Sequence, residues 1–200
     1  EYAIMQPIYA ELHDRVPPRE GQIRNILVYF GGADTDNLTG MTISAFKSLL
    51  VDDVSMDVVA PSSSPHIEYL QRITENNARI HLHESLPSLA PLMVKADLAI
   101  GAGGATSWER CCLGLPSLVV TLAENQNPIA EELNKLDLIR WIGRIKHVTE
   151  IDIAKQLNSM LNKKLDKKWS SKCKLIADGN GTKSVSSIIT LDSSKMLRIH

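Results

Sequence analysis

The sequence predicts an α/β fold, a Rossmann-like doubly wound parallel sheet of about six strands, and two observations support this fold class. Apolar runs of strand length alternate with segments of helical periodicity along most of the 200 residues. The runs are continuous, as in "NILVYF", which is typical of strands that helices cover on both faces. Strict alternation of strands and helices predicts parallel strands joined by right-handed crossovers.

The expected strands are short apolar runs bounded by turn residues. They cover residues 25–30, 56–60, 78–82, 97–101, 117–121 and 138–143. The expected helices carry apolar residues three or four positions apart, and Pro91 and Pro128 lie near the start of two of them, where proline is favoured. The helices cover residues 41–50, 64–74, 88–96, 128–136 and 149–165, with a short helix that stops at Gly114 and one or two more within residues 169–191.

The two ends of the chain differ from this pattern. Residues 1–24 contain three prolines and a glycine, and they do not start with Met, so we expect an interdomain linker from a longer chain. Residues 25–190 form the expected Rossmann-like domain. Residues 191–200 are expected to be a tail or the start of a further domain, because "SSKMLRIH" does not continue the helical pattern.

Composition excludes several classes of protein. The net charge is −1, so no electrostatic footprint for nucleic acid or an anionic membrane is present, and the apolar runs are too short to span a bilayer. The three cysteines (Cys111, Cys112 and Cys173) are odd in number and lack CxxC spacing, which disfavours a disulfide framework and a metal site. We therefore expect a cytoplasmic domain without nucleic-acid or membrane partners.

Two glycine-rich turns indicate where a ligand binds. In a sheet of order 3-2-1-4-5-6, ligands bind beyond the carboxyl ends of the first and fourth strands, which lie side by side. Here both strands end in paired glycines, Gly31-Gly32 and Gly103-Gly104, the second pair just after Gly101. Two such loops beside a helix N-terminus favour an anion site over two simple turns. The dinucleotide fingerprint GxGxxG is absent after the first strand, so we expect no NAD and no other cofactor.

Thr106 and Glu109 fit two interpretations. Thr-x-x-Glu is the pattern of a capping box, in which both side chains satisfy backbone N–H groups at a helix start. Alternatively, the Glu109 carboxylate accepts hydrogen bonds from both hydroxyls of a ribose. Spacing alone leaves these interpretations open.

Polar side chains also follow the fifth and third strands. Glu124, Asn125, Gln126 and Asn127 suit sugar hydroxyls, although Asn127 also suits a helix cap before a proline. His81 and His83 lie on one side of a strand, but no third metal ligand is evident, so a solvated strand end is favoured over a metal site. No motif that pairs a nucleophile with a base is present.

Three stretches carry a family resemblance. "ILVYFGGADTDNLT", "ADLAIGAGGATSWERCCLGLPSLVVTLAENQ" and "ADGNGTKSV" resemble the C-terminal, nucleotide-binding half of the UDP-2,4-diacetamido-2,4,6-trideoxy-β-L-altropyranose hydrolases (the PseG/SpsG-like group). That group is similar to the glycosyltransferase MurG and shares its two-domain GT-B fold. The resemblance extends to about residue 190.

The resemblance implies a role for each candidate residue. Pyrophosphate would bind at Gly103, Gly104, Ala105 and Thr106, and ribose at Glu109. Asn125 and Gln126 would contact the sugar or a phosphate. Gly31 and Gly32 would close the crevice, and uracil would lie near residues 81–87.

The catalytic part of the family is missing from these residues. The family's N-terminal domain carries a glycine-rich loop that ends in the histidine thought to activate water, and none of His13, His66, His81, His83 and His147 has that context. The resemblance thus implies UDP or a UDP-sugar as ligand, an N-terminal domain of the same polypeptide as partner, and an inactive isolated chain. The alternatives are half of a MurG-like glycosyltransferase and a non-catalytic nucleotide-sugar binding module.

Overall fold

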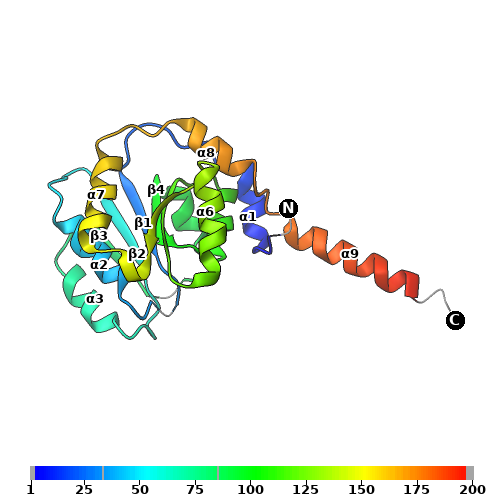
Figure 1. Cartoon of the computed structure of the whole chain (residues 1–200), viewed down its shortest axis with the longest axis horizontal. Coiled ribbons are helices and arrows are strands. Elements are labelled where there is room, and N and C mark those ends of the chain that lie inside the picture. Colours follow the sequence, from blue (N-terminus) through cyan, green and yellow to red (C-terminus); the bar gives the residue numbers. More distant parts are fainter. Residues whose placement is uncertain (1–2, 33, 85, 197–200) are drawn as a thin grey trace.

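The computed structural model describes residues 3–32, 34–84 and 86–196, which form a parallel sheet between two layers of helices (Figure 1). The strand order is β3-β2-β1-β4-β5-β6, and every neighbouring pair is parallel. This order confirms the predicted fold class and places the first and fourth strands side by side. The strands are β1 (Asn25–Tyr29), β2 (Ser55–Val59), β3 (Ile80–His83), β4 (Leu98–Ala102), β5 (Ser117–Thr121) and β6 (Arg140–Arg144).

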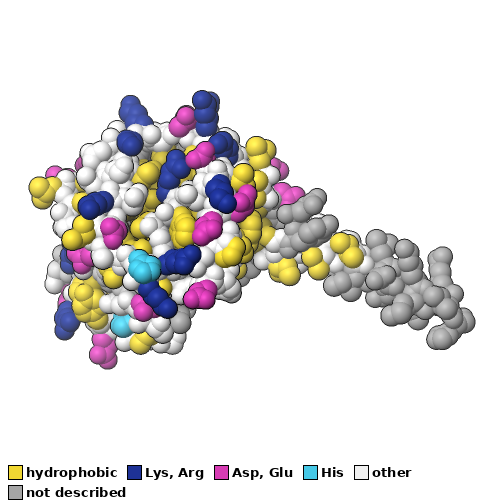
Figure 2. Space-filling model, viewed as in Figure 1, with side chains coloured by type: hydrophobic (Ala, Val, Ile, Leu, Met, Phe, Trp, Pro, Cys, Tyr) yellow, Lys and Arg dark blue, Asp and Glu magenta, His cyan; other side chains and the backbone are white. Residues whose placement is uncertain are grey.

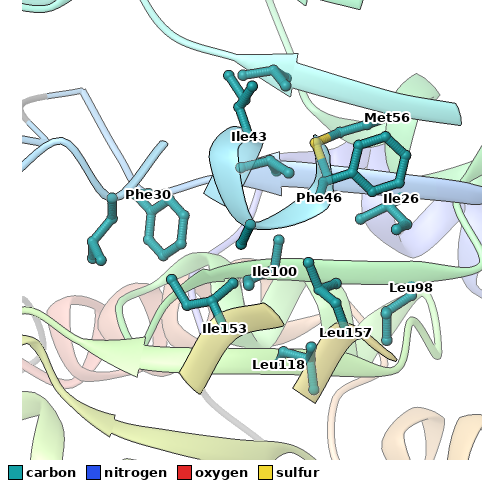
Figure 3. Packing of buried hydrophobic residues seen from close by; sticks show 14 of the residues in the cluster. Ile26, Phe30, Ile43, Phe46, Met56, Leu98, Ile100, Leu118, Ile153 and Leu157 are labelled. Carbon is teal, nitrogen blue, oxygen red and sulfur yellow. The ribbon is translucent and has the colours of Figure 1, made fainter. Parts of the chain in front are cut away.

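Helices cover both faces of the sheet, and each layer has its own apolar core. One face carries α2 (Leu38–Lys47), α3 (Ile67–Thr74) and α7 (Glu150–Leu161). Figure 3 shows α2 and α7 side chains meeting strand side chains there, among them Phe46 and Leu157. The other face carries α1 (Pro7–His13), α4 (Ala90–Lys95), α5 (Thr106–Cys112), α6 (Asn127–Lys135) and α8 (Lys167–Lys174).

Burial on both faces explains why the strands are continuous apolar runs. Along β4, Leu98 and Ile100 point into one core and Ala99 into the other. All five residues of β5 are buried as well. An alternating pattern of polar and apolar residues would have placed polar side chains in one of the two cores.

The N-terminal segment is folded onto the domain, although the sequence predicts a linker there. Residues 7–13 form the helix α1, with Pro7 in its first turn and Tyr9 only 1% exposed. Further along, the buried guanidinium of Arg19 donates hydrogen bonds to the carbonyls of Met93 (2.6 Å), Ala96 (3.2 Å) and Leu113. These bonds satisfy carbonyls at the ends of α4 and α5, which lack partners within their helices. The domain boundary at residue 24 stays a prediction.

The last helix, α9 (Gly181–Met196), extends away from the body of the domain (Figure 1). It continues through residue 196, so the expectation that "SSKM" leaves the helix is wrong; residues 197–200 lie outside the described residues. Its first turn crosses the N-terminal segment, where Thr182 Oγ1 donates to the Met5 carbonyl at 3.0 Å. Glycine is required at this crossing, because a Cβ at Gly181 would lie 2.2 Å from the Ala3 carbonyl oxygen.

Gly179 gives a test of how tightly the two segments pack. Its φ is +82°, and a Cβ there would lie 2.6 Å from backbone atoms of Ala10. We expect Gly179→Ala to lower the free energy of unfolding by about 2 kcal/mol or more, through backbone strain and overpacking. Urea unfolding measures this. Gly32→Ala is the matched control, since a Cβ at Gly32 meets no atom within 4 Å. Equal stability of the two variants would contradict the close packing.

Candidate functional site

A cavity of about 600 Å³ lies at the carboxyl ends of β1, β2 and β3, beside the start of α5. This is the edge at which open parallel sheets bind ligands. Its walls come from five parts of the chain: α1, the ends of β1 and β2, the loop between β3 and α4, and the first turn of α5. The lining residues are Gln6, Tyr9, Tyr29, Gly32, Val59, Pro61, Glu84, Leu86, Pro87, Ser88, Leu89, Thr106 and Glu109.

The structure divides the predicted glycines into three groups. Gly31, with a φ of +98°, turns the chain at the end of β1, and Gly32 lines the cavity. Gly101 serves strand packing, because a Cβ there would lie 2.2 Å from the Tyr29 carbonyl oxygen on β1. Gly103 and Gly104 form the turn that leads into α5.

The turn at Gly103 and Gly104 packs against Gln126. A Cβ at Gly103 would lie 3.5 Å from Gln126 Oε1, and one at Gly104 would lie 3.8 Å from Gln126 Nε2. Gln126 Oε1 also accepts a hydrogen bond from the Leu122 amide at 2.9 Å. The fold therefore brings together the glycine turn and one of the two amide residues assigned to the sugar or phosphate.

The other polar residues after β5 have separate positions. Asn125 and Glu124 are exposed. The expectation that Asn127 caps α6 is wrong, since Gln126 is the N-cap residue and makes no side-chain cap. Asn127 Oδ1 instead accepts a hydrogen bond from Thr121 Oγ1 at 2.7 Å, which ties the start of α6 to the end of β5.

The capping-box interpretation of Thr106 and Glu109 is wrong. Helix α5 starts at Thr106, its N-cap is Ala105, and the structure shows no side-chain cap at this helix start. Thr106 Oγ1 accepts instead from Arg110 Nη1 at 3.4 Å, and Glu109 lines the cavity. A capping box does occur elsewhere, at Thr149 and Asp152.

Glu109 is half-buried beside two tyrosines. Burial raises the pKa of its carboxyl group, while a hydrogen bond with Tyr9 and the charge of Arg110 lower it. Burial also raises the pKa of Tyr9 and of Tyr29, and the Glu109 charge adds to both shifts. A partly desolvated carboxylate in a cavity wall is a strong acceptor for ligand hydroxyl groups.

Arg110 lies beneath the glycine turn. The residue is 3% exposed, and its guanidinium donates hydrogen bonds to the Ala102 carbonyl (2.8 Å) and to Ser107 Oγ (2.9 Å). Burial lowers the pKa of Arg110 to about 10, so the group stays cationic at neutral pH. Its Nε has no hydrogen-bond partner among the described residues. A fixed positive charge thus lies under the residues assigned to pyrophosphate.

The two histidines of β3 have separate surroundings and do not form a pair of metal ligands. His81 is exposed, and His83 Nε2 makes a hydrogen bond of 2.7 Å with Asp57 Oδ1 on β2. Within the described ranges, no group of three potential metal ligands is found. The three cysteines are buried and free.

Sequence reasoning missed Tyr9 in the cavity wall and Asp34 in the turn that follows β1. Asp34 is buried and accepts hydrogen bonds from the amides of Leu38 and Thr39, which fixes the turn after β1. An acid a few residues before a helix was the available signal. No sequence signal pointed to Tyr9, because its segment was expected to be a linker. Of residues 81–87, expected near uracil, the structure places Glu84, Leu86 and Pro87 in the cavity wall, and residue 85 lies outside the described residues.

The charge distribution and the lengths of the helices describe the surface further. On the face in Figure 2, basic and acidic side chains are interspersed. No helix in the described part of the chain is long and apolar enough to cross a membrane.

Comparisons with known proteins find a sequence relative and solved structures of similar fold. It is 33% identical over 132 residues to the spore coat polysaccharide biosynthesis protein SpsG of Bacillus subtilis (strain 168), an alignment that covers 66% of this chain and 39% of SpsG. Its fold is similar to that of MurG from Acinetobacter baumannii, with a TM-score of 0.73 and 19% identity over 94% of this chain and 55% of MurG. The fold is also similar to that of MnaA from S. aureus in a co-structure with UDP (TM-score 0.64, 14% identity, 95% and 50% coverage).

The chain therefore spans about two fifths of SpsG and about half of MurG. The family model of the glycosyltransferase family 28 C-terminal domain matches residues 63–188, which include β3 to β6 and the glycine turn before α5. Since this match covers more than half of the sequence, the chain belongs to the glycosyltransferase family 28 C-terminal domain family.

Proposed function

We propose that this domain binds UDP or a UDP-linked sugar. The observation that carries the proposal is the half-buried Glu109 carboxylate, which lines the cavity one turn after a glycine turn, in a chain of this family. The carboxylate accepts hydrogen bonds from the ribose hydroxyls. Support also comes from the similar fold of MnaA, whose structure was solved with UDP.

The pyrophosphate in this proposal binds at Gly103, Gly104, Ala105 and Thr106. Glycine lets an anion approach the backbone closely, and the first N–H groups of a helix have no partners within the helix. The buried charge of Arg110 beneath the turn favours an anion there. Gln126, which packs on this turn, and the exposed Asn125 then face the sugar or the phosphate.

The remaining residues enclose the nucleoside. Gly31 and Gly32 close the crevice opposite α5, and Gly32 borders the cavity. Uracil binds along the loop between β3 and α4, where Leu86 and Pro87 provide apolar surface. A cavity of about 600 Å³ is in the range of pockets that hold ligands of this size.

The parent reaction that we infer is hydrolysis of a UDP-linked 2,4-diacetamido-2,4,6-trideoxy sugar in pseudaminic or nonulosonic acid biosynthesis, in the cytoplasm. Water attacks the anomeric carbon, the bond from that carbon to the phosphate oxygen breaks, and UDP leaves. Residues 103–106 stabilise the charge that develops on the leaving phosphate. We place the group that activates water in an N-terminal domain of the same polypeptide, so the isolated chain should bind UDP without turnover. The sequence similarity to SpsG, a spore coat polysaccharide biosynthesis protein, supports a role of the parent protein in sugar metabolism.

A second candidate is transfer of the sugar to an acceptor, as the C-terminal half of a MurG-like glycosyltransferase. The family model and the fold similarity to MurG favour it. In both reactions this domain holds the nucleotide as leaving group, and a non-catalytic binding module would use the same contacts. Incubation of the full-length protein with a UDP-linked diacetamido sugar, with and without acceptor, distinguishes the three by the products formed.

Substitution of Glu109 tests the ribose contact. We expect UDP to raise the melting temperature of the wild-type domain, and Glu109→Gln to weaken UDP binding by roughly 10-fold or more, since hydrogen bonds to charged groups contribute about 1.5–3 kcal/mol. Calorimetric titration measures the change. Glu68→Gln, on the exposed side of α3, is the control and should bind as wild type. Unaltered UDP binding by Glu109→Gln would remove the ribose role.

The raised pKa of Glu109 predicts a pH dependence of ribose recognition. Protonation removes a carboxylate acceptor, so affinity for UDP relative to 2′-deoxy-UDP should fall as the pH is lowered. Because burial raises this pKa, the fall should begin above the pH at which an exposed glutamate titrates. Both nucleotides carry the same diphosphate, so its titration changes both dissociation constants alike and does not change their ratio. A ratio that stays constant down to the pH of acid unfolding would contradict this.

A further inference from the structure

Tyr9 belongs to α1, but its ring lies in the wall of the nucleotide cavity. The side chain is 1% exposed, and its hydroxyl makes side-chain hydrogen bonds with Glu109 on α5 and with Ser88 on the loop before α4. A residue of the N-terminal segment thus joins the two walls of the cavity.

Helix α1 is fixed to the end of α5 by further contacts. His13 Nδ1 lies 2.8 Å from the Cys112 carbonyl oxygen, and Cys112 Sγ donates to the Tyr9 carbonyl at 3.5 Å. Arg19, beyond the helix, donates to the Leu113 carbonyl. These contacts hold the Tyr9 backbone in place relative to Glu109, so the hydroxyl has a defined position.

We propose that Tyr9 is a positioning residue, whose hydroxyl orients the Glu109 carboxylate toward the ribose. This inference rests on the proposed function. The Tyr9 hydroxyl has one proton, which it donates to Glu109 while it accepts from the Ser88 hydroxyl. A carboxylate has two oxygens, so a bond to one of them fixes the rotamer and leaves the other for the ribose hydroxyls.

The Tyr9 hydroxyl also affects the charge state of Glu109. Besides Tyr9, Glu109 has Arg110 beside it in the chain, Tyr29 opposite on β1, and Glu84 in the same cavity wall. The hydrogen bond from Tyr9 lowers the pKa of Glu109 and so opposes the effect of burial. Loss of this hydroxyl therefore shifts the titration of Glu109 to higher pH.

Tyr9→Phe tests the proposal, because it keeps the ring and removes the hydroxyl. We expect affinity for UDP to fall about 3- to 10-fold, affinity for 2′-deoxy-UDP to change less than about 2-fold, and the pH midpoint of ribose discrimination to rise. Calorimetric titrations of both nucleotides over a pH series measure all three. Ser88→Ala should shift discrimination in the same direction by a smaller amount, which provides a second variant should Tyr9→Phe not fold.

Tyr29→Phe is the matched control. Tyr29 lines the same cavity. Glu109 affects the pKa of Tyr29 through its charge and not through a hydrogen bond, so Tyr29→Phe should keep the wild-type pH midpoint of ribose discrimination. The inference is overturned if Tyr9→Phe weakens the binding of both nucleotides equally, or if it leaves ribose discrimination and its pH midpoint unchanged. Tyr9 would then have only a structural role, and the proposed function would still stand. If the wild-type domain binds neither nucleotide, the proposed function fails, and the inference fails with it.

Discussion

The close pairing of β1 with β4 is the constraint on which the rest of the structure depends. It requires Gly101, because any side chain there would meet the Tyr29 carbonyl on the neighbouring strand, and a Cβ would also lie 3.0 Å from Arg110 Nη1. The space that glycine leaves is thus bordered by a buried cation. This pairing sets the strand order, and the order brings the two glycine turns to one edge of the sheet. Gly101 therefore permits both the pairing of β1 with β4 and the position of the Arg110 guanidinium beside the site.

The site is completed from outside the sheet. The sheet edge supplies glycine turns and the first turn of α5, but the wall that faces Glu109 comes from α1. That helix has seven residues, too few to be stable in isolation, and it exists because Tyr9 is buried against α4 and α5. The cavity is therefore complete only when the N-terminal segment is folded against the domain. A Rossmann-like sheet without this segment would have an open groove at the same edge.

The sequence predicts the fold well because the signal is local and repeated. Continuous apolar runs such as residues 117–121 predict buried parallel strands, and the strand order follows from the fold class. The site is harder to predict, because its contacts join distant segments. Thr106 and Glu109 have the spacing of a capping box, yet the helix begins at Thr106 and Glu109 hydrogen-bonds with Tyr9, 100 positions earlier. No local pattern encodes such a contact, and prolines near Tyr9 indicated a linker.

The crossing of the two end segments has a mechanical consequence. The backbones meet at Ala3 and Gly181 and again at Ala10 and Gly179, with no room for a side chain at either glycine. Tension applied to the chain on either side would pass directly between these contacts. Tension would therefore reach this crossing as well as the six strands. A larger side chain at either glycine would push the two end segments apart and weaken the junction between them.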